Sequence, residues 1–360
     1  MKRILFAGGG TAGHIEPAIA VAREWQSQHS DSHIGFIGTR DGLESHLVPE
    51  AGFDIHFITK VRIARSFSPS LLLFPFTLIR AVAQSITLMR SCDLLIGFGG
   101  YVSGPAYLAA ALTRTPFVIH EANARPGLAN RLGALLTPYL AISHHDIRGK
   151  LSRALFTGLP LRSDVVRAYK AASQDWESAR IAAKRELGFD SSKPLIFIFG
   201  GSQGSQALNG VIAETRSSIV SQGIQILHGV GARNQIPASL DGYQAHGYIK
   251  NMATAYLAAD LIISRSGAVT CAEVNTLGRY ALFIPLPIGN GEQELNAVYL
   301  VKQSRAEIIS QKYFTPTWLT SNIKNLLAHS SAAPVAGSAS DISAATKIVS
   351  LMQQALSGGR

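Results

Sequence analysis

The sequence is poor in cysteine and in charged residues, and both shortages narrow the class of protein. Its two cysteines, Cys92 and Cys271, lie far apart and in no Cys-x-x-Cys spacing, which excludes a disulfide framework and a four-cysteine zinc site. So few cysteines fit a reducing, cytoplasmic compartment. Charged residues make up 16% of the 360 residues and hydrophobic residues 47%, so the composition is that of a globular protein rather than a disordered one.

Several patterns that carry function are also missing. The chain has no Walker A sequence, which argues against P-loop chemistry, and no Asp-x-Asp pair, which argues against a metal ion bridging a sugar nucleotide. We expect no metal at His144, His145 and Asp146, because the side chains of adjacent residues diverge in any regular element. The longest apolar stretch, 71–89, contains a proline and an arginine, and no apolar segment of sufficient length follows Met1. We therefore expect neither a transmembrane helix nor a secretory signal.

The balance of charge is basic. There are 33 basic and 23 acidic residues, which give a formal net charge of +10. This predicts an anionic partner, and a phosphorylated substrate, a nucleic acid or an anionic membrane surface would each fit. A basic surface with no partner is also compatible with the charge alone.

The order of predicted elements indicates an α/β fold with two similar halves. An apolar strand at 3–7 is followed by a glycine-rich turn, a helix at 16–25 and a strand at 34–37. The same order begins again at 195–199, with a turn at 200–204 and a helix at 206–220. Such units predict two Rossmann-like, doubly wound parallel sheets. Further strands are expected at 94–98, 117–120, 140–143, 225–227, 261–264 and 281–285.

The segment 157–162 contains glycine and proline and is a candidate hinge between the halves. We expect domains at 1–161 and 162–341. Residues 169–187 are expected to be helical, and 330–340 to form a surface loop. The last predicted helix, 342–356, has no domain of its own, and we expect the segment 342–360 to pack back toward the first domain.

The glycine turns are candidate anion-binding sites. A glycine turn at the start of a helix presents free N–H groups and the positive end of the helix dipole. Three such turns occur, at 8–13, 97–104 and 200–204. The spacing of Gly8, Gly10 and Gly13 also matches the dinucleotide-binding fingerprint, so an NAD(P)-dependent oxidoreductase remains an alternative. The other interpretation is that these turns bind no ligand and that their glycines only allow a strand and a helix to pack closely.

Four side chains that follow glycine-containing turns, the first turn above and two more at 264–267 and 285–291, are suited to sugar-nucleotide chemistry. His14 follows the first turn and could act as a general base, with its pKa lowered by the helix N-terminus. Glu273 lies one turn into a helix, where its carboxylate could accept two ribose hydroxyls or serve only as a favourable acid of a helix start. Gln293 and Asn296 could bind sugar hydroxyls, since amides both donate and accept.

Taken together, these motifs resemble the MurG family of bacterial glycosyltransferases. The resemblance runs from Lys2 to Ala297. The motifs occur in the family's order at 9–14, 97–105, 120–123, 200–204, 265–268 and 292–297. It implies a GT-B fold, in which the two Rossmann-like domains face a cleft, and inverting transfer of N-acetylglucosamine from UDP-N-acetylglucosamine. The implied acceptor is undecaprenyl-pyrophosphoryl-N-acetylmuramoyl-pentapeptide, with no metal, no cofactor and no nucleic acid involved.

The resemblance also implies roles for residues. In the second domain, the donor diphosphate would face Ser202 and the N–H groups of Ala268, Val269 and Thr270. Ile249 would hold the uracil by its backbone, Glu273 the ribose and Gln293 the transferred sugar. From the first domain, the donor site would be completed by Thr11, Ala12, Gly13, Asn123 and Arg162. The acceptor would be received by Gly10, Gly99, Gly100, Tyr101, His120 and Glu121.

Two positions depart from the family's pattern. Ala12 replaces a common glycine, and since alanine tolerates positive φ poorly the turn is expected to be less flexible. Leu159 stands where many members have asparagine. Neither change removes a reactive group. His14 is our choice for the catalytic base, and Glu121 remains the alternative.

One segment of the first half predicts contact with a membrane. Five basic residues and no acidic ones lie between 60 and 90, around an apolar stretch at 71–79. An apolar patch flanked by cations is typical of segments that lie in the interface of an anionic leaflet. We expect Leu72, Phe74, Phe76 and Arg80 to make this contact, at the cytoplasmic face of the membrane. A buried helix with a basic end is the alternative.

Overall fold

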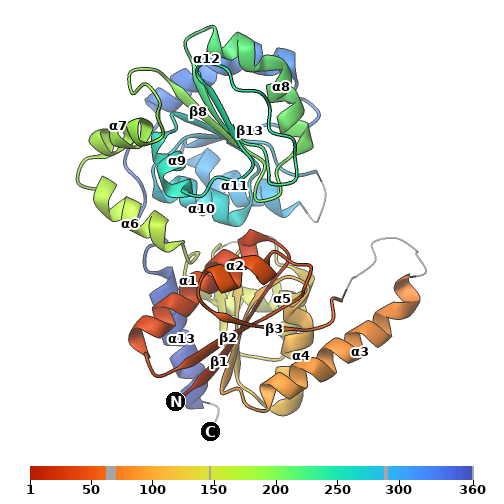
Figure 1. Ribbon diagram of the computed structural model, residues 1–360. Coiled ribbons are helices and arrows are strands. Elements are labelled where there is room, and N and C mark those ends of the chain that lie inside the picture. Colours follow the sequence, from red (N-terminus) through yellow and green to blue (C-terminus); the bar gives the residue numbers. More distant parts are fainter. Residues whose placement is uncertain (62–69, 146, 288–290, 359–360) are drawn as a thin grey trace. The chain divides into compact units, whose positions relative to one another are not determined.

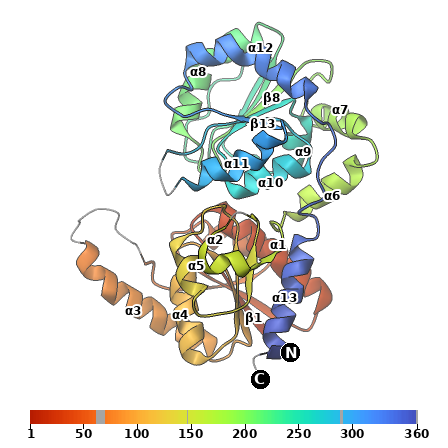
Figure 2. The ribbon, with the colours of Figure 1, turned by 180° about the vertical axis from the view of Figure 1, so that it is seen from behind.

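The computed structural model describes residues 1–61, 70–145, 147–287 and 291–358, and the side chains of 70–73 are also outside the description. The chain divides into two compact units. Unit 1 comprises residues 1–162 and 341–360, and unit 2 comprises residues 163–340. Figures 1 and 2 show each unit as a sheet covered by helices on both faces.

Unit 1 contains a seven-stranded sheet in the order β3-β2-β1-β4-β5-β6-β7. Its strands are β1 (Arg3–Gly8), β2 (His33–Gly38), β3 (Asp54–Phe57), β4 (Leu94–Gly99), β5 (Phe117–Glu121), β6 (Leu140–Ile142) and β7 (Leu155–Phe156). Its helices are α1 (Ala12–Gln28), α2 (Glu44–Glu50), α3 (Ser70–Met89), α4 (Ser103–Thr113), α5 (Leu128–Gly133), the 3-10 helix Gly149–Arg153 and α13 (Ala344–Gly358).

Unit 2 contains a six-stranded sheet in the order β10-β9-β8-β11-β12-β13. Its strands are β8 (Leu195–Phe199), β9 (Gln225–Gly229), β10 (Tyr243–His246), β11 (Leu261–Ser264), β12 (Ala281–Phe283) and β13 (Ala306–Ile308). Its helices are α6 (Ser163–Ala172), α7 (Trp176–Glu186), α8 (Gln206–Val220), α9 (Met252–Ala258), α10 (Ala268–Thr276), α11 (Glu292–Lys302) and α12 (Pro316–Ala332).

The paired strands of both sheets are parallel, which confirms the predicted α/β class. In unit 1, Ile4 of β1 pairs with Ile34 on one side and Leu94 on the other. Central strands of a parallel sheet are covered on both faces and are therefore apolar throughout. All nine predicted strands occur, with ends shifted by up to two residues.

Two predicted segments differ from the structure. The helical stretch 169–187 is two helices, because Asp175 interrupts it and caps α7 by accepting the N–H of Ser178 at 3.0 Å. The predicted loop at 330–340 begins later, since α12 continues to Ala332.

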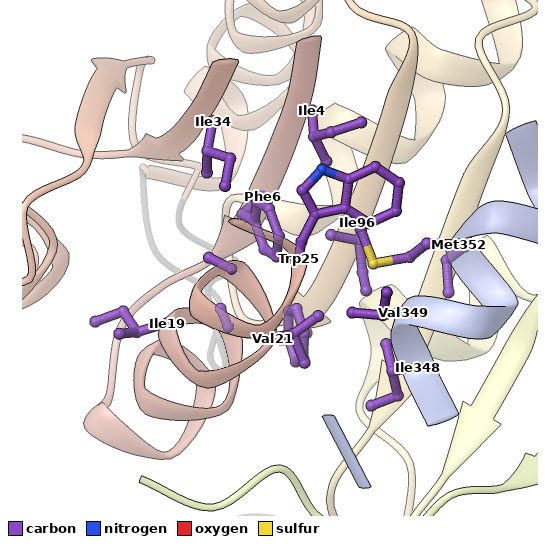
Figure 3. Packing of buried hydrophobic residues seen from close by; sticks show 14 of the residues in the cluster. Ile4, Phe6, Ile19, Val21, Trp25, Ile34, Ile96, Ile348, Val349 and Met352 are labelled. Carbon is purple, nitrogen blue, oxygen red and sulfur yellow. The ribbon is translucent and has the colours of Figure 1, made fainter. Parts of the chain in front are cut away.

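The C-terminal helix α13 belongs to unit 1, where it packs against α1. The two helices share one hydrophobic cluster, shown in Figure 3. The indole ring of Trp25 on α1 lies against Met352 on α13, and both side chains are buried. Burying a large aromatic ring against an aliphatic chain contributes on the order of 2 kcal/mol. This packing fixes the end of the chain to the unit in which the chain begins.

Both sheets place a switch of strand order next to the predicted glycine turns. In unit 1 the order reverses between β1 and β4, and in unit 2 between β8 and β11. Loops that leave such a pair of strands run in opposite directions and leave a crevice for ligands at the carboxyl ends. The turns after β1 and β4, and those after β8 and β11, are therefore in the positions where an α/β sheet binds substrates.

Candidate active site

The turn after β1 holds His14 in one orientation. Gly10 has a φ of +96°, a conformation that glycine adopts without strain. Thr11 is the N-cap of α1, and Ala12 is its first residue. Ala12 is not among the residues with positive φ, so the expectation that alanine would constrain this turn is wrong. The left-handed position of the motif is Gly10.

The hydrogen bonds of His14 fix its tautomer. Its Nδ1 lies 3.1 Å from the carbonyl oxygen of Gly9, and since a carbonyl can only accept, Nδ1 carries the proton. Nε2 then has the free lone pair that a general base requires. Within the described residues, no hydrogen bond occupies Nε2. The Nε2 edge lies beside Gly99, where an added Cβ would be 3.4 Å away.

The electrostatic surroundings keep His14 neutral near pH 7. Burial lowers the pKa of His14, and the charge of Glu121, the hydrogen bond to Gly9 and the charge of Glu44 oppose this shift. The direction agrees with the sequence analysis, but the main cause is burial rather than the helix N-terminus. A neutral imidazole with a free Nε2 is ready to accept a proton.

The turn after β4 packs backbone to backbone against the turn after β1. Gly99 and Gly100 both have positive φ, and a Cβ on Gly100 would lie 2.2 Å from the carbonyl oxygen of Gly9. The N–H of Gly10 donates to the carboxylate of Glu44 at 3.1 Å. This N–H is therefore already bound within the protein, and the acceptor-binding role of Gly10 stays a prediction.

Glu121 has four hydrogen-bond donors around a carboxylate that is 2% exposed. Oε1 accepts from the backbone and side chain of Asn123 at 2.9 and 3.2 Å. Oε2 accepts from the N–H of Gly127 and from Asn130, both at 3.0 Å. Both carboxylate oxygens of Glu121 are therefore occupied by donors. The geometry therefore favours His14 over Glu121 as the base and assigns Glu121 to holding the loop that carries Asn123.

His120 is completely buried. Its Nε2 lies 3.1 Å from the carbonyl oxygen of Gly158 and 3.1 Å from Ser143 Oγ. Burial lowers the pKa of His120 to about 4, so the ring is neutral. The imidazole has no surface for a ligand to contact, so a direct role in acceptor binding stays a prediction that this geometry does not support. The ring joins β5 to the segment that leaves unit 1.

In unit 2 the start of α10 lies at the switch point. The first N–H groups of a helix have no partner within it, and here they belong to Ala268, Val269 and Thr270. Thr270, whose hydroxyl is a further candidate donor, is half-buried. Glu273 lies farther along the same helix and is 1% exposed. The diphosphate and ribose roles of these residues remain predictions.

The other donor-site candidates of unit 2 come from separate loops. Ser202 is half-buried in the turn after β8, between Gly201 and Gly204, both of which have positive φ. The side chain of Ile249 lies over Gly229 at the end of β9, where a Cβ would be 3.2 Å away. Gln293 Oε1 accepts the N–H of Leu286 at 3.0 Å. The side-chain NH2 group of Gln293 is its other polar group and can act as a donor.

Arg265 is a functional candidate to which the sequence analysis gave no role. It is 8% exposed and donates to four oxygens from three loops. Its partners are the carbonyls of Ile284 and Pro285, the hydroxyl of Ser205, which caps α8, and Gln311 Oε1 at 2.6 Å. It thus ties together the loops around the start of α10, a role that only the folded arrangement reveals.

The segment predicted to meet the membrane is partly exposed. Phe76 is 72% exposed and Arg80 is exposed, whereas Phe74 packs against the core of unit 1. The side chain of Leu72 lies outside the described residues. Ile79, one turn from Phe76, is 67% exposed. None of the described helices has the length and apolar character needed to cross a bilayer.

Two further positions complete the sites predicted from sequence. Asn123 and Arg162 are both half-buried in unit 1. Of the segment 144–146, which we expected to hold no metal, Asp146 lies outside the described residues.

Comparison with known proteins decides the family. Residues 4–137 match the Glycosyltransferase family 28 N-terminal domain, and residues 195–354 match the Glycosyltransferase family 28 C-terminal domain. The chain is 41% identical over 331 residues to the UDP-N-acetylglucosamine–N-acetylmuramyl-(pentapeptide) pyrophosphoryl-undecaprenol N-acetylglucosamine transferase of Corynebacterium glutamicum, covering 91% of this chain and 90% of that protein. The chain belongs to the MurG family.

Other relatives agree with this assignment. The transferase of the same name from Streptomyces coelicolor is 41% identical over 90% of this chain and 89% of its own. The crystal structure of Acinetobacter baumannii MurG is 28% identical, with a TM-score of 0.71 over 98% of this chain and 100% of that one. The resemblance and the GT-B class are thus confirmed, and the chain is a UDP-sugar glycosyltransferase. The relatives give the oxidoreductase alternative no support.

Proposed function

We propose that this chain transfers N-acetylglucosamine from UDP-N-acetylglucosamine to the C4 hydroxyl of a lipid-linked N-acetylmuramoyl-pentapeptide, with inversion at the anomeric carbon. The observation that carries the proposal is the match in sequence over nine-tenths of the chain to transferases of that name. Within the site, the orientation of His14 supports it, since the bond to Gly9 leaves Nε2 unprotonated.

The proposed step needs one base and one stabilised leaving group. His14 Nε2 takes the proton of the acceptor hydroxyl while that oxygen attacks the anomeric carbon. The new glycosidic bond forms as the bond from that carbon to the diphosphate oxygen breaks on the opposite face, and UDP leaves. The N–H groups at the start of α10 would stabilise the charge that develops on the diphosphate. The product is the disaccharide still attached to its lipid carrier.

The experiment is a transfer assay with labelled UDP-N-acetylglucosamine and a short-chain lipid-linked muramoyl-pentapeptide. We expect labelled disaccharide product, and no product when UDP-glucose replaces the donor at the same concentration. The temperature of thermal unfolding should rise when UDP is added and stay unchanged when NADH is added, because only a ligand that binds the folded chain stabilises it. Stabilisation by NADH with no product in the transfer assay would refute the proposal.

We further propose that the chain binds the cytoplasmic face of the membrane through α3. On this proposal its anionic partner is a membrane surface rather than a nucleic acid. Phe76 and Ile79 are large apolar side chains with more than half of their surface in water. Arg80 and Arg90 on and beyond the same helix are exposed, and α3 packs along α4, where Leu112 is also exposed. Exposed apolar groups beside cations fit the interface of an anionic leaflet.

This proposal has a direct test in vesicles. The chain should sediment with vesicles that contain anionic phospholipid. In a separate binding assay, it should show no binding to single-stranded RNA that survives an increase in salt concentration. The double variant Phe76→Ser and Ile79→Ser should weaken vesicle binding and transfer to a vesicle-embedded acceptor, and should retain transfer to a water-soluble one. Ile236→Ser is a matched control, because Ile236 is 55% exposed in unit 2. Equal losses on both acceptors would mean that α3 serves only the fold.

A further inference from the structure

The carboxylate of Glu44 is buried directly behind the first glycine turn. Glu44 is the first residue of α2 and has no exposed surface. An ionised carboxylate is costly to bury unless several donors bind it. The donors around Glu44 therefore show which parts of the structure its charge holds in place.

Three loops supply these donors, and each leaves the carboxyl end of a different strand. Oε2 accepts the N–H of Gly10 after β1 at 3.1 Å. Oε1 accepts the hydroxyl of Tyr101 after β4 at 2.7 Å and both the N–H and the hydroxyl of Thr39 after β2 at 3.0 and 3.1 Å. The two hydroxyls are also within 3.0 Å of each other. One side chain thus joins the turns of three neighbouring strands.

The first glycine turn packs closely against both Glu44 and Tyr101. A Cβ added to Gly9 would lie 3.1 Å from Glu44 Oε1, and one added to Gly10 would lie 3.0 Å from the ring of Tyr101. On its other side, the carbonyl of Gly9 accepts the proton of His14 Nδ1. The position of the catalytic imidazole therefore depends on the turn, and the position of the turn depends on Glu44.

We propose that Glu44 is a positioning residue, which holds the turn 8–10 and Tyr101 in the arrangement that orients His14 and receives the acceptor. This inference rests on the proposed function. Tyr101 contributes as a donor, since burial and Glu44 raise its pKa to about 12 and keep its proton in place. Replacing the carboxylate with an amide would put an N–H group against donors and break the arrangement.

The charge of Glu44 gives the proposal a signature that packing alone would not have. The acidic groups that act on His14 are Glu44 from α2 and Glu121 from β5, and both favour its protonated form. Tyr101 is also titratable and faces the turn, and it stays neutral. Glu44→Gln removes one of the two acidic charges, so the acid limb of kcat/KM should move to lower pH. Loss of packing would lower the rate and leave that limb in place.

The experiment compares Glu44→Gln with Glu50→Gln, an exposed acid on the same helix. We expect Glu44→Gln to lower kcat/KM for the acceptor at least tenfold and to shift the acid limb downward, with UDP affinity within twofold of the unchanged chain. Glu50→Gln should match the unchanged chain in kcat/KM for the acceptor, in the position of the acid limb and in UDP affinity. Tyr101→Phe keeps the carboxylate and removes one donor, so it should show a smaller loss, and the double variant should lose less than the product of the two single losses.

The outcomes separate this inference from the proposed function. If the unchanged chain transfers no sugar, the proposed function fails, and the titration of the His14 ring by NMR in both forms still tests Glu44. If transfer occurs and Glu44→Gln keeps its acceptor KM, kcat and acid limb, the inference alone fails. Loss of activity with an unmoved acid limb also overturns it. If Glu44→Gln does not fold, an unaltered acceptor kcat/KM in Tyr101→Phe decides against it.

Discussion

Acid should destabilise unit 1, because His120 is buried in its neutral form. Nε2 carries the proton toward Gly158, and Nδ1 is buried with no partner among the described residues. A second proton on Nδ1 would have no acceptor, and the pKa of His120 in the folded chain is accordingly about 4, against 6.5 for the free side chain. Between these values the unfolded chain binds the proton and the folded chain does not. Stability is therefore present above pH 6.5 and is lost as the pH falls toward 4.

The size of the effect follows from the two pKa values. One pH unit corresponds to about 1.4 kcal/mol, so lowering the pH from 6.5 to about 5 should remove about 2 kcal/mol of unfolding free energy. Urea unfolding can be followed in unit 1 by Trp25 after Trp176 and Trp318, the two tryptophans of unit 2, are changed to phenylalanine.

The comparison that isolates His120 uses a variant with no titratable group at that position. His120→Gln keeps an N–H group that can donate to Gly158. When the pH is lowered from 7 to about 5, the unfolding free energy of this variant should fall by about 2 kcal/mol less than that of the unchanged chain. The exposed His46→Gln should leave the loss unchanged. Equal losses in His120→Gln and the unchanged chain would refute the assignment of a neutral, buried ring.

Three further predictions concern catalysis and donor binding. His14→Ala should lower kcat by about 10²–10⁴ and leave UDP affinity nearly unchanged, and a near-normal kcat would move the base elsewhere. Glu273→Gln should raise the KM for UDP-N-acetylglucosamine about tenfold through loss of a charge-assisted bond, whereas an unchanged KM would make it only a helix acid. Arg265→Lys cannot reach its four acceptors, so calorimetry should show weaker UDP binding at an unchanged acceptor KM. Intact UDP affinity would show that the loops hold without the guanidinium.

The central strands could be predicted from sequence, whereas the outermost ones could not. All four strands that the sequence analysis missed, β3, β7, β10 and β13, are the edges of their sheets. A central parallel strand is covered on both faces and forms a continuous apolar run, as Leu195–Phe199 does. An edge strand such as Asp54–Phe57 is partly exposed and has two polar residues in four, which leaves no pattern distinct from a loop. Its pairing is set by the neighbouring strand.

The candidate site was predictable where chemistry follows a glycine turn. His14 stands directly after such a turn, and Ala268–Thr270 begin a helix after one, so position along the chain indicates their environment. Glu44 and Arg265 have no such signal. Their partners lie 5 to 60 positions away along the chain, and most of them come together only when the sheet of each unit has formed.

The two buried charges suit the different chemistry that we propose for the two units. Each binds loops at the switch point of its own sheet, and the partners that bind it in the described part of the chain are neutral groups. In unit 1 the charge is the negative Glu44, which acts to raise the pKa of His14, the base that we propose. In unit 2 the charge is the positive Arg265, beside the turn and helix start expected to hold an anionic leaving group. Each buried charge thus holds the loops of its own unit and also has the sign that suits the step proposed for that unit.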